Sequence, residues 1–77
     1  MPSLAYVLIN VETGSEVEVC KSLLNILKVK EAYIVYGAYD IIVKVEAEDV
    51  DSLKDVISMK IRRTPKVKST LTMMVIE

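Results

Sequence analysis

Two small groups of residues are the parts of this sequence whose types and spacing could support ligand binding or other chemistry. The candidates are Gly37, Tyr39 and Asp40 in one group, and Thr70 and Thr72 in the other. Asp40 could accept a charge-assisted hydrogen bond from an ammonium group, and Gly37, which has no Cβ atom, would let the backbone approach a ligand closely. Residues two apart on a strand share a face, so both threonine hydroxyls could reach one cleft. With Tyr39 as an apolar wall, these residues could bind a zwitterion such as an amino acid.

Each of these residues also has a structural interpretation. Gly37 could simply supply a positive φ in a turn, and Asp40 could bond only to backbone N–H groups of that turn. Thr70 and Thr72 are also ordinary strand residues. The residue types therefore leave a ligand-binding role and a structural role open at every position.

The composition excludes several classes of site. The chain of 77 residues contains one cysteine and no histidine, which removes disulfide scaffolds, zinc sites, iron–sulfur centres and Ser-His-Asp or Cys-His catalysis. We therefore predict a non-catalytic protein with no metal and no cofactor. Ten Lys and Arg against eleven Asp and Glu give a net charge of −1. This balance lacks the basic excess typical of nucleic-acid binders, so no direct nucleic-acid partner is expected.

The hydropathy of the sequence predicts the cellular compartment of the protein. No apolar run approaches the ~20 residues that a membrane span needs, and the N-terminus lacks the pattern of a secretory signal. A cytoplasmic protein without a membrane partner is therefore expected. The chain has no Gln and two Asn alongside abundant Lys, Glu, Ile and Val, a composition that favours a thermophilic source.

The periodicity of apolar residues predicts the order β-α-β-β-α-β. Strands are expected at residues 4–11, 31–36, 40–47 and 67–76, with a first helix near 15–27 and a second between Asp49 and Thr64. Ser15 and Glu18 read as a capping box, Asp49 as an N-cap, and Pro65 as the stop of the second helix. This order predicts an α+β, ferredoxin-like fold, with a four-stranded antiparallel sheet and both helices on one face.

One sheet face should then remain apolar and uncovered. Two helices cover one face, yet the strands do not alternate apolar and polar residues as a solvated face requires. A contiguous apolar patch usually marks an interface, and a domain this small gains stability by association. We predict a homodimer with sheets packed face to face, against the alternative of a monomer with an open face. The expected interface residues are Leu4, Tyr6, Leu8, Met74 and Ile76.

Two segments of the chain resemble the effector domain of the Lrp/AsnC family of transcriptional regulators, called RAM for regulation of amino acid metabolism. The first is residues 29–46, where a pattern similar to the family hallmark V-x-E-x-x-x-V-x-G-x-Y-D-x-x-x-x-V falls on Val29, Glu31, Val35, Gly37, Tyr39, Asp40 and Val45. The second is residues 64–75, which resembles the closing strand with its two threonines. The resemblance covers essentially the whole chain. The chain departs from the pattern at Lys66, where the family often has glycine.

This resemblance implies a single RAM domain over residues 1–77, without the N-terminal DNA-binding helix-turn-helix of full-length family members, from an archaeal thermophile. It implies dimers that join into a higher oligomer, an octamer or a decamer. It also implies an amino-acid effector bound between dimers near the Gly37–Asp40 turn, and a role in transcriptional regulation of amino acid metabolism. Mixed assembly with full-length Lrp/AsnC regulators is a further expectation.

Three other functions remain open. One is a structural homo-oligomeric assembly module without a ligand. Another is a cofactor-free enzyme with a dimeric ferredoxin-like fold, which would need a polar pocket cluster, commonly with His. The last is RNA binding through the sheet, which would need exposed aromatic residues on the central strands.

Overall fold

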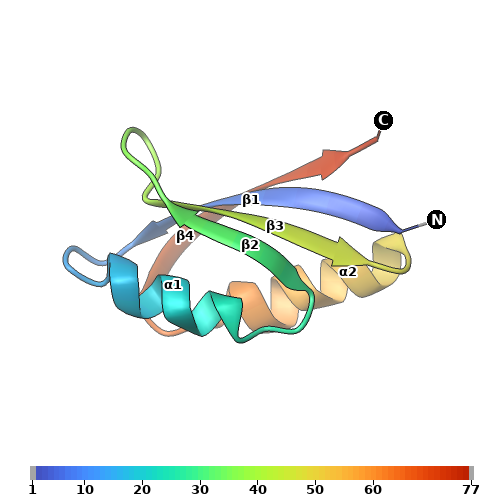
Figure 1. Cartoon of the computed structure of the whole chain (residues 1–77), viewed down its shortest axis with the longest axis horizontal. Coiled ribbons are helices and arrows are strands. Elements are labelled where there is room, and N and C mark those ends of the chain that lie inside the picture. Colours follow the sequence, from blue (N-terminus) through green and yellow to red (C-terminus); the bar gives the residue numbers. More distant parts are fainter. Residues whose placement is uncertain (1, 77) are drawn as a thin grey trace.

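The computed structural model describes residues 2–76 and has the predicted element order. The elements are β1 (Ser3–Val11), α1 (Glu16–Leu24), β2 (Val29–Ile34), β3 (Ile41–Ala47), α2 (Val50–Val56) with a π-helical extension η1 (Ile57–Ile61), and β4 (Val67–Val75). The four strands form one antiparallel sheet in the order β2-β3-β1-β4. Both helices lie on the same side of this sheet (Figure 1). The predicted ferredoxin-like α+β fold is confirmed.

The core lies between the helices and the two central strands. Alternate residues of β1 and β3 face the helices, and the register pairs Ala5 with Val45, Val7 with Val43 and Ile9 with Ile41, all fully buried. The helices complete this core with buried aliphatic side chains: Val19 and Leu23 from α1, and Leu53, Ile57 and Ile61 from the second helix. The period of two in the strands therefore sets which sheet face meets the helices.

The first helix is shorter than predicted, and its capping box is absent. Ser15 makes no side-chain cap; its buried backbone N–H donates to the Glu12 carbonyl oxygen at 3.0 Å instead. The carboxylate of Glu18 pairs with Lys66 Nζ at 3.0 Å. A tertiary contact thus replaces the local reciprocal cap that the spacing of Ser15 and Glu18 predicted.

The second helix begins as predicted and ends in a wide turn. Asp49 Oδ1 accepts a hydrogen bond from the Ser52 N–H at 2.8 Å, and this bond lowers the pKa of Asp49. At the other end the Arg62 N–H donates to the Ile57 carbonyl oxygen at 3.0 Å, an i to i+5 bond. Such turns occur as short insertions in α-helices, frequently at functional sites.

The connection into β4 contains a residue in an unusual conformation. Lys66 has φ +73°, in the left-handed region, and its carbonyl oxygen accepts from the Glu12 N–H at 3.0 Å. Glycine adopts this conformation without steric cost, which explains why glycine would suit this position. The ion pair with Glu18 and the backbone bond to Glu12 hold Lys66 there.

Residues 2–76 contain neither a membrane-spanning helix nor a group of metal ligands. Neither helix is long and apolar enough to cross a membrane. Within the same residues, no three His, Cys, Asp or Glu side chains are grouped so that they could hold a metal ion.

Candidate ligand-binding site and sheet surface

The structure divides the predicted site residues between two separate cavities. One cavity of about 380 Å³ lies between the base of the β2–β3 turn and the start of α1; its lining is Glu16, Val17, Ile34, Val35, Tyr36 and Asp40. The other, of about 350 Å³, lies between β4 and the second helix; its lining is Lys54, Ile57, Ser58, Arg62, Thr70, Thr72 and Met74. The two cavities share no residue, and neither includes Gly37 or Tyr39. One chain therefore does not bring the predicted site together.

Asp40 ties the β2–β3 turn to two neighbouring strands. Its Oδ2 accepts from the Val11 N–H at 2.9 Å, and its own N–H donates to the Ile9 carbonyl oxygen at 2.9 Å. Its carbonyl oxygen accepts from the Val35 N–H at 2.9 Å. The side chain of Asp40 therefore binds a backbone N–H group, but this group belongs to β1 and not, as the structural interpretation expected, to the turn; the second carboxylate oxygen makes no hydrogen bond to residues 2–76.

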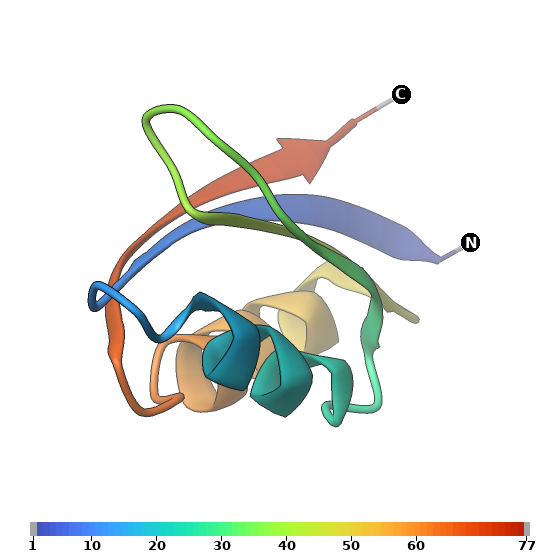
Figure 2. The same cartoon turned by 60° about the vertical axis from the view of Figure 1, so that its left-hand side comes forward.

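Gly37 lies in the same turn with φ +129°, a backbone conformation that residues other than glycine rarely adopt. A Cβ atom built at Gly37 would meet nothing within 4 Å. The glycine is therefore required by backbone conformation and not by crowding within the chain. Both views show the turn rising beyond the sheet on the side away from the helices (Figures 1 and 2).

Thr70 and Thr72 share one face of β4, as predicted, and the structure shows that this is the face on the side of the helices. They pair with the buried residues Ile9 and Val7 of β1, but β4 is the edge strand, and the second helix packs mainly against β1 and β3. The uncovered strip beside β4 is the floor of the cavity. The hydroxyls of Thr70 and Thr72 are therefore accessible to a ligand.

Three helix residues of this cavity were missed by the sequence analysis. Lys54, Ser58 and Arg62 follow one another at intervals of four residues, so they lie along one side of the helix. They flank the buried residues Leu53, Ile57 and Ile61 of the same helix. That spacing was available in the sequence; only the fold shows that this side of the helix faces the threonines of β4.

The outer sheet face, which no helix covers, carries an apolar patch over β1 and β4. Register places its residues in three cross-strand pairs: Leu4 with Val75, Tyr6 with Met73 and Leu8 with Leu71. We call these six residues the outer patch. Its β1 members are half-buried and its β4 members are exposed, Met73 by 48%.

The predicted interface set is divided by this register. Leu4, Tyr6 and Leu8 lie on the outer face, but Met74 pairs with Ala5 on the helix side, next to Thr72. Grouping Met74 with Leu4 was therefore wrong. Ile76 lies beyond the end of β4 and is 96% exposed. The pairing of β4 with β1 decides which face of β4 lies on the side of the helices, and the alternation within β4 alone does not give that pairing.

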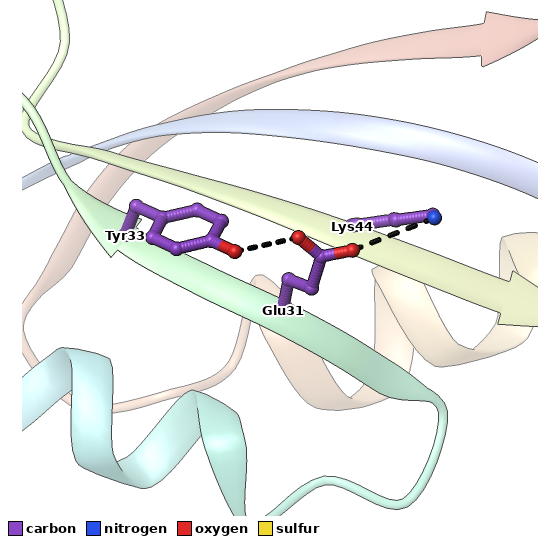
Figure 3. A network of polar contacts seen from close by, with 3 residues as sticks. All are labelled: Glu31, Tyr33 and Lys44. Carbon is purple, nitrogen blue, oxygen red and sulfur yellow. Dashed lines mark hydrogen bonds and ion pairs between the residues drawn. The ribbon is translucent and has the colours of Figure 1, made fainter.

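The outer face of β2 and β3 carries a network of polar contacts beside the apolar side chain of Ile42. Tyr33 Oη donates to Glu31 Oε1 at 2.6 Å, and Lys44 Nζ lies 3.5 Å from Glu31 Oε2 (Figure 3). The hydrogen bond from Tyr33, aided by Lys44, lowers the pKa of Glu31, and the same bond to Glu31 raises the pKa of Tyr33. The outer face thus carries the apolar outer patch over β1 and β4 and this charged network over β2 and β3.

The family model of the Lrp/AsnC ligand binding domain matches residues 4–77. The chain belongs to the Lrp/AsnC family. Among curated relatives, it is 35% identical over 77 residues to the HTH-type transcriptional regulator FL11 of Pyrococcus abyssi, covering 96% of this chain and 48% of FL11. It is 40% identical over 79 residues to homocitrate synthase of Saccharolobus solfataricus, covering 99% of this chain and 17% of the synthase. The chain therefore spans about half of the regulator and a small part of the enzyme.

Solved structures agree with this membership. The hypothetical protein PHS023 from Pyrococcus horikoshii is 44% identical with a TM-score of 0.91, covering 100% of this chain and 92% of that one. AsnC of Escherichia coli is 26% identical with a TM-score of 0.90, covering 97% of this chain and 51% of AsnC. The feast or famine regulatory protein Rv3291c of M. tuberculosis, solved with L-methionine, shares the fold at 24% identity and a TM-score of 0.79, covering 97% of this chain and 50% of that one. The Pyrococcus relatives support the expected archaeal source.

Proposed function

We propose that this chain is a non-catalytic regulatory domain that binds an amino acid between copies of itself. The family is one of ligand-binding domains of regulators, and a relative of the same fold was solved with L-methionine. The observation that carries the proposal is the pair of incomplete, chemically complementary cavities on one chain.

The two cavities suit opposite ends of an amino acid. Glu16 and Asp40 give the first cavity acidic oxygens beside apolar side chains, which fits an ammonium group. Lys54, Arg62 and three hydroxyls give the second cavity donors, which fits a carboxylate. Because the cavities lie at different edges of the sheet, one ligand can meet both types of group only if they come from two copies.

The outer patch supplies a reason for copies to associate. Its six apolar residues form a continuous surface, and burying apolar surface contributes about 25 cal/mol per Å². A second copy packed sheet to sheet on this patch buries it in both chains, as isologous dimers do. The β2–β3 turn rises on the same side of the sheet (Figure 2), so a copy on that side would meet the turn. Further association into an octamer or a decamer would then place turns beside neighbouring cavities.

Regulation is the proposed outcome of this binding. The relatives that carry a similar segment include a transcriptional regulator and a metabolic enzyme of which it is a small part. A sensing module fits both contexts better than a catalytic one. Through the same outer patch, this domain would also join full-length Lrp/AsnC chains, which co-purification with such a regulator would test.

The test is native mass spectrometry with and without a mixture of amino acids, followed by calorimetry of any amino acid retained. We expect a dimer or larger assembly that carries ligand, and a loss of affinity of at least about 10-fold in Thr72→Val. The matched control is Thr13→Val, which removes the same hydroxyl from an exposed turn. An assembly that retains no amino acid would instead favour the structural module without a ligand.

A further inference from the structure

The cavity beside β4 is strongly asymmetric in charge. Lys54 and Arg62 both line it, together with the hydroxyls of Ser58, Thr70 and Thr72, and its lining contains no carboxylate. An adjoining cavity of about 290 Å³ continues along β4 and adds Lys68; it shares Arg62 and Thr70 with the first. Three cations therefore line one continuous strip of the surface.

Among residues 2–76, these cations form no ion pair. The ion pairs among residues 2–76 are Lys44 with Glu31 and Lys66 with Glu18, and neither involves Lys54, Arg62 or Lys68. The strip is thus unlike the charged network on the outer face, where the lysine is already paired with a carboxylate. Its positive charge is available to a ligand.

Arg62 holds the central position in this strip. It directly follows the π-helical turn and lines both cavities. A guanidinium group presents a planar fork of donors that matches a carboxylate, and Thr70 stands on the opposite wall of both cavities. A second carboxylate bound along the strip would meet Lys54 on one side or Lys68 on the other.

From this we infer that the effector class of the domain is an amino acid with an anionic side chain. The inference rests on the proposed function. A neutral amino acid carries one carboxylate, which leaves an uncompensated cation beside it in the cavity. An acidic amino acid carries two, which match Arg62 and Lys54 in number and sign, while Ile57 and Met74 contact its short methylene chain.

The test is calorimetric titration of the full chain with glutamate, aspartate and their amides glutamine and asparagine. Each acid and its amide have nearly the same shape, so their ratio of affinities reports the side-chain charge. We expect one acid to bind at least about 10-fold more tightly than its amide, because charge-assisted hydrogen bonds are roughly twice as strong as neutral ones. Arg62→Gln should reduce that ratio to near unity. Arg63→Gln, which removes the same charge next to Arg62 but outside both cavities, should preserve it.

The outcomes separate this inference from the proposed function. If an amide or an apolar amino acid such as methionine binds more tightly than both acids, the class is wrong while amino-acid binding stands. If no amino acid binds, the proposed function fails as well. Succinate, which carries two carboxylates and no ammonium group, should bind at least about 10-fold more weakly than the preferred acid; equal affinity would overturn the assignment to an amino acid.

Discussion

Substitution of Asp40 separates its structural role from its proposed role in binding. Asp40→Ala leaves the Val11 N–H without its acceptor, and Val11 is 5% exposed. A buried donor without a partner costs about 1–3 kcal/mol. For a domain of this size each kcal/mol lowers the melting temperature by roughly 4–8 °C. We therefore expect Asp40→Ala to melt several degrees below the wild type.

Asp40→Asn should behave differently, because its amide oxygen can still accept from the Val11 N–H. It loses the negative charge, and its amide NH₂ cannot accept a bond from the ligand ammonium. We expect a loss of stability of about 1 kcal/mol, the difference between a charged and a neutral hydrogen bond, and a loss of amino-acid affinity of about 10-fold or more.

Urea denaturation at fixed protein concentration, with calorimetry of binding, measures both effects. Protein concentration must be fixed because association stabilises the fold by mass action. Wild-type stability in Asp40→Ala would refute the structural role of the Val11 bond. Unchanged affinity in Asp40→Asn would refute the binding role while leaving the structural one intact.

Three further perturbations follow from the structure. Lys66 has φ +73°, so Lys66→Gly should be more stable than Lys66→Ala by about 1 kcal/mol, and both variants lose the pair with Glu18 equally; equal urea midpoints would contradict this. Met73→Glu places a charge in the outer patch and should weaken dimerisation at least about 100-fold in sedimentation, whereas Leu27→Glu, also exposed, should not. Tyr33→Phe should remove the alkaline limb of the pH–stability profile and weaken the acid limb, because Lys44 also lowers the pKa of Glu31 and remains in the variant. The lowered pKa of Glu31 gives stability that is lost as pH falls through the folded value, and the raised pKa of Tyr33 gives stability that is lost as pH rises through its folded value; an unchanged profile would exclude this contact.

Local sequence patterns were enough to predict the fold. The features that these patterns missed depend on contacts between residues that lie far apart in sequence. The alternation in β1 and β3 and the cap at Asp49 are local features, and the structure confirms them. Ser15 and Glu18 had the spacing of a capping box, but Glu18 pairs with Lys66, which lies 48 residues away in sequence. A sequence pattern limited to the residues near Glu18 therefore does not show that Lys66 binds its carboxylate.

In the candidate site as well, local sequence predicted some features, and tertiary contacts determined the others. The hydroxyls of Thr70 and Thr72 were placed on one face by the strand period, and they share a cavity. The face of Met74 depended on the register with β1, and the cations opposite the threonines depended on how the second helix packs. Asp40 and the threonines lie in different cavities because β1 and β3 separate the two edges of the sheet, a distance that sequence spacing does not encode.

The most direct test of a site shared between copies is complementation between two variants that each bind the amino acid weakly. Thr72→Val and Asp40→Asn are each expected to bind weakly alone. If subunits are mixed by unfolding and refolding them together, random pairing gives about a quarter of the sites an intact Thr72 from one copy and an intact Asp40 from another. The account predicts that calorimetry of the mixture recovers this fraction of wild-type sites at wild-type affinity. A mixture that binds no better than the separate variants would contradict it.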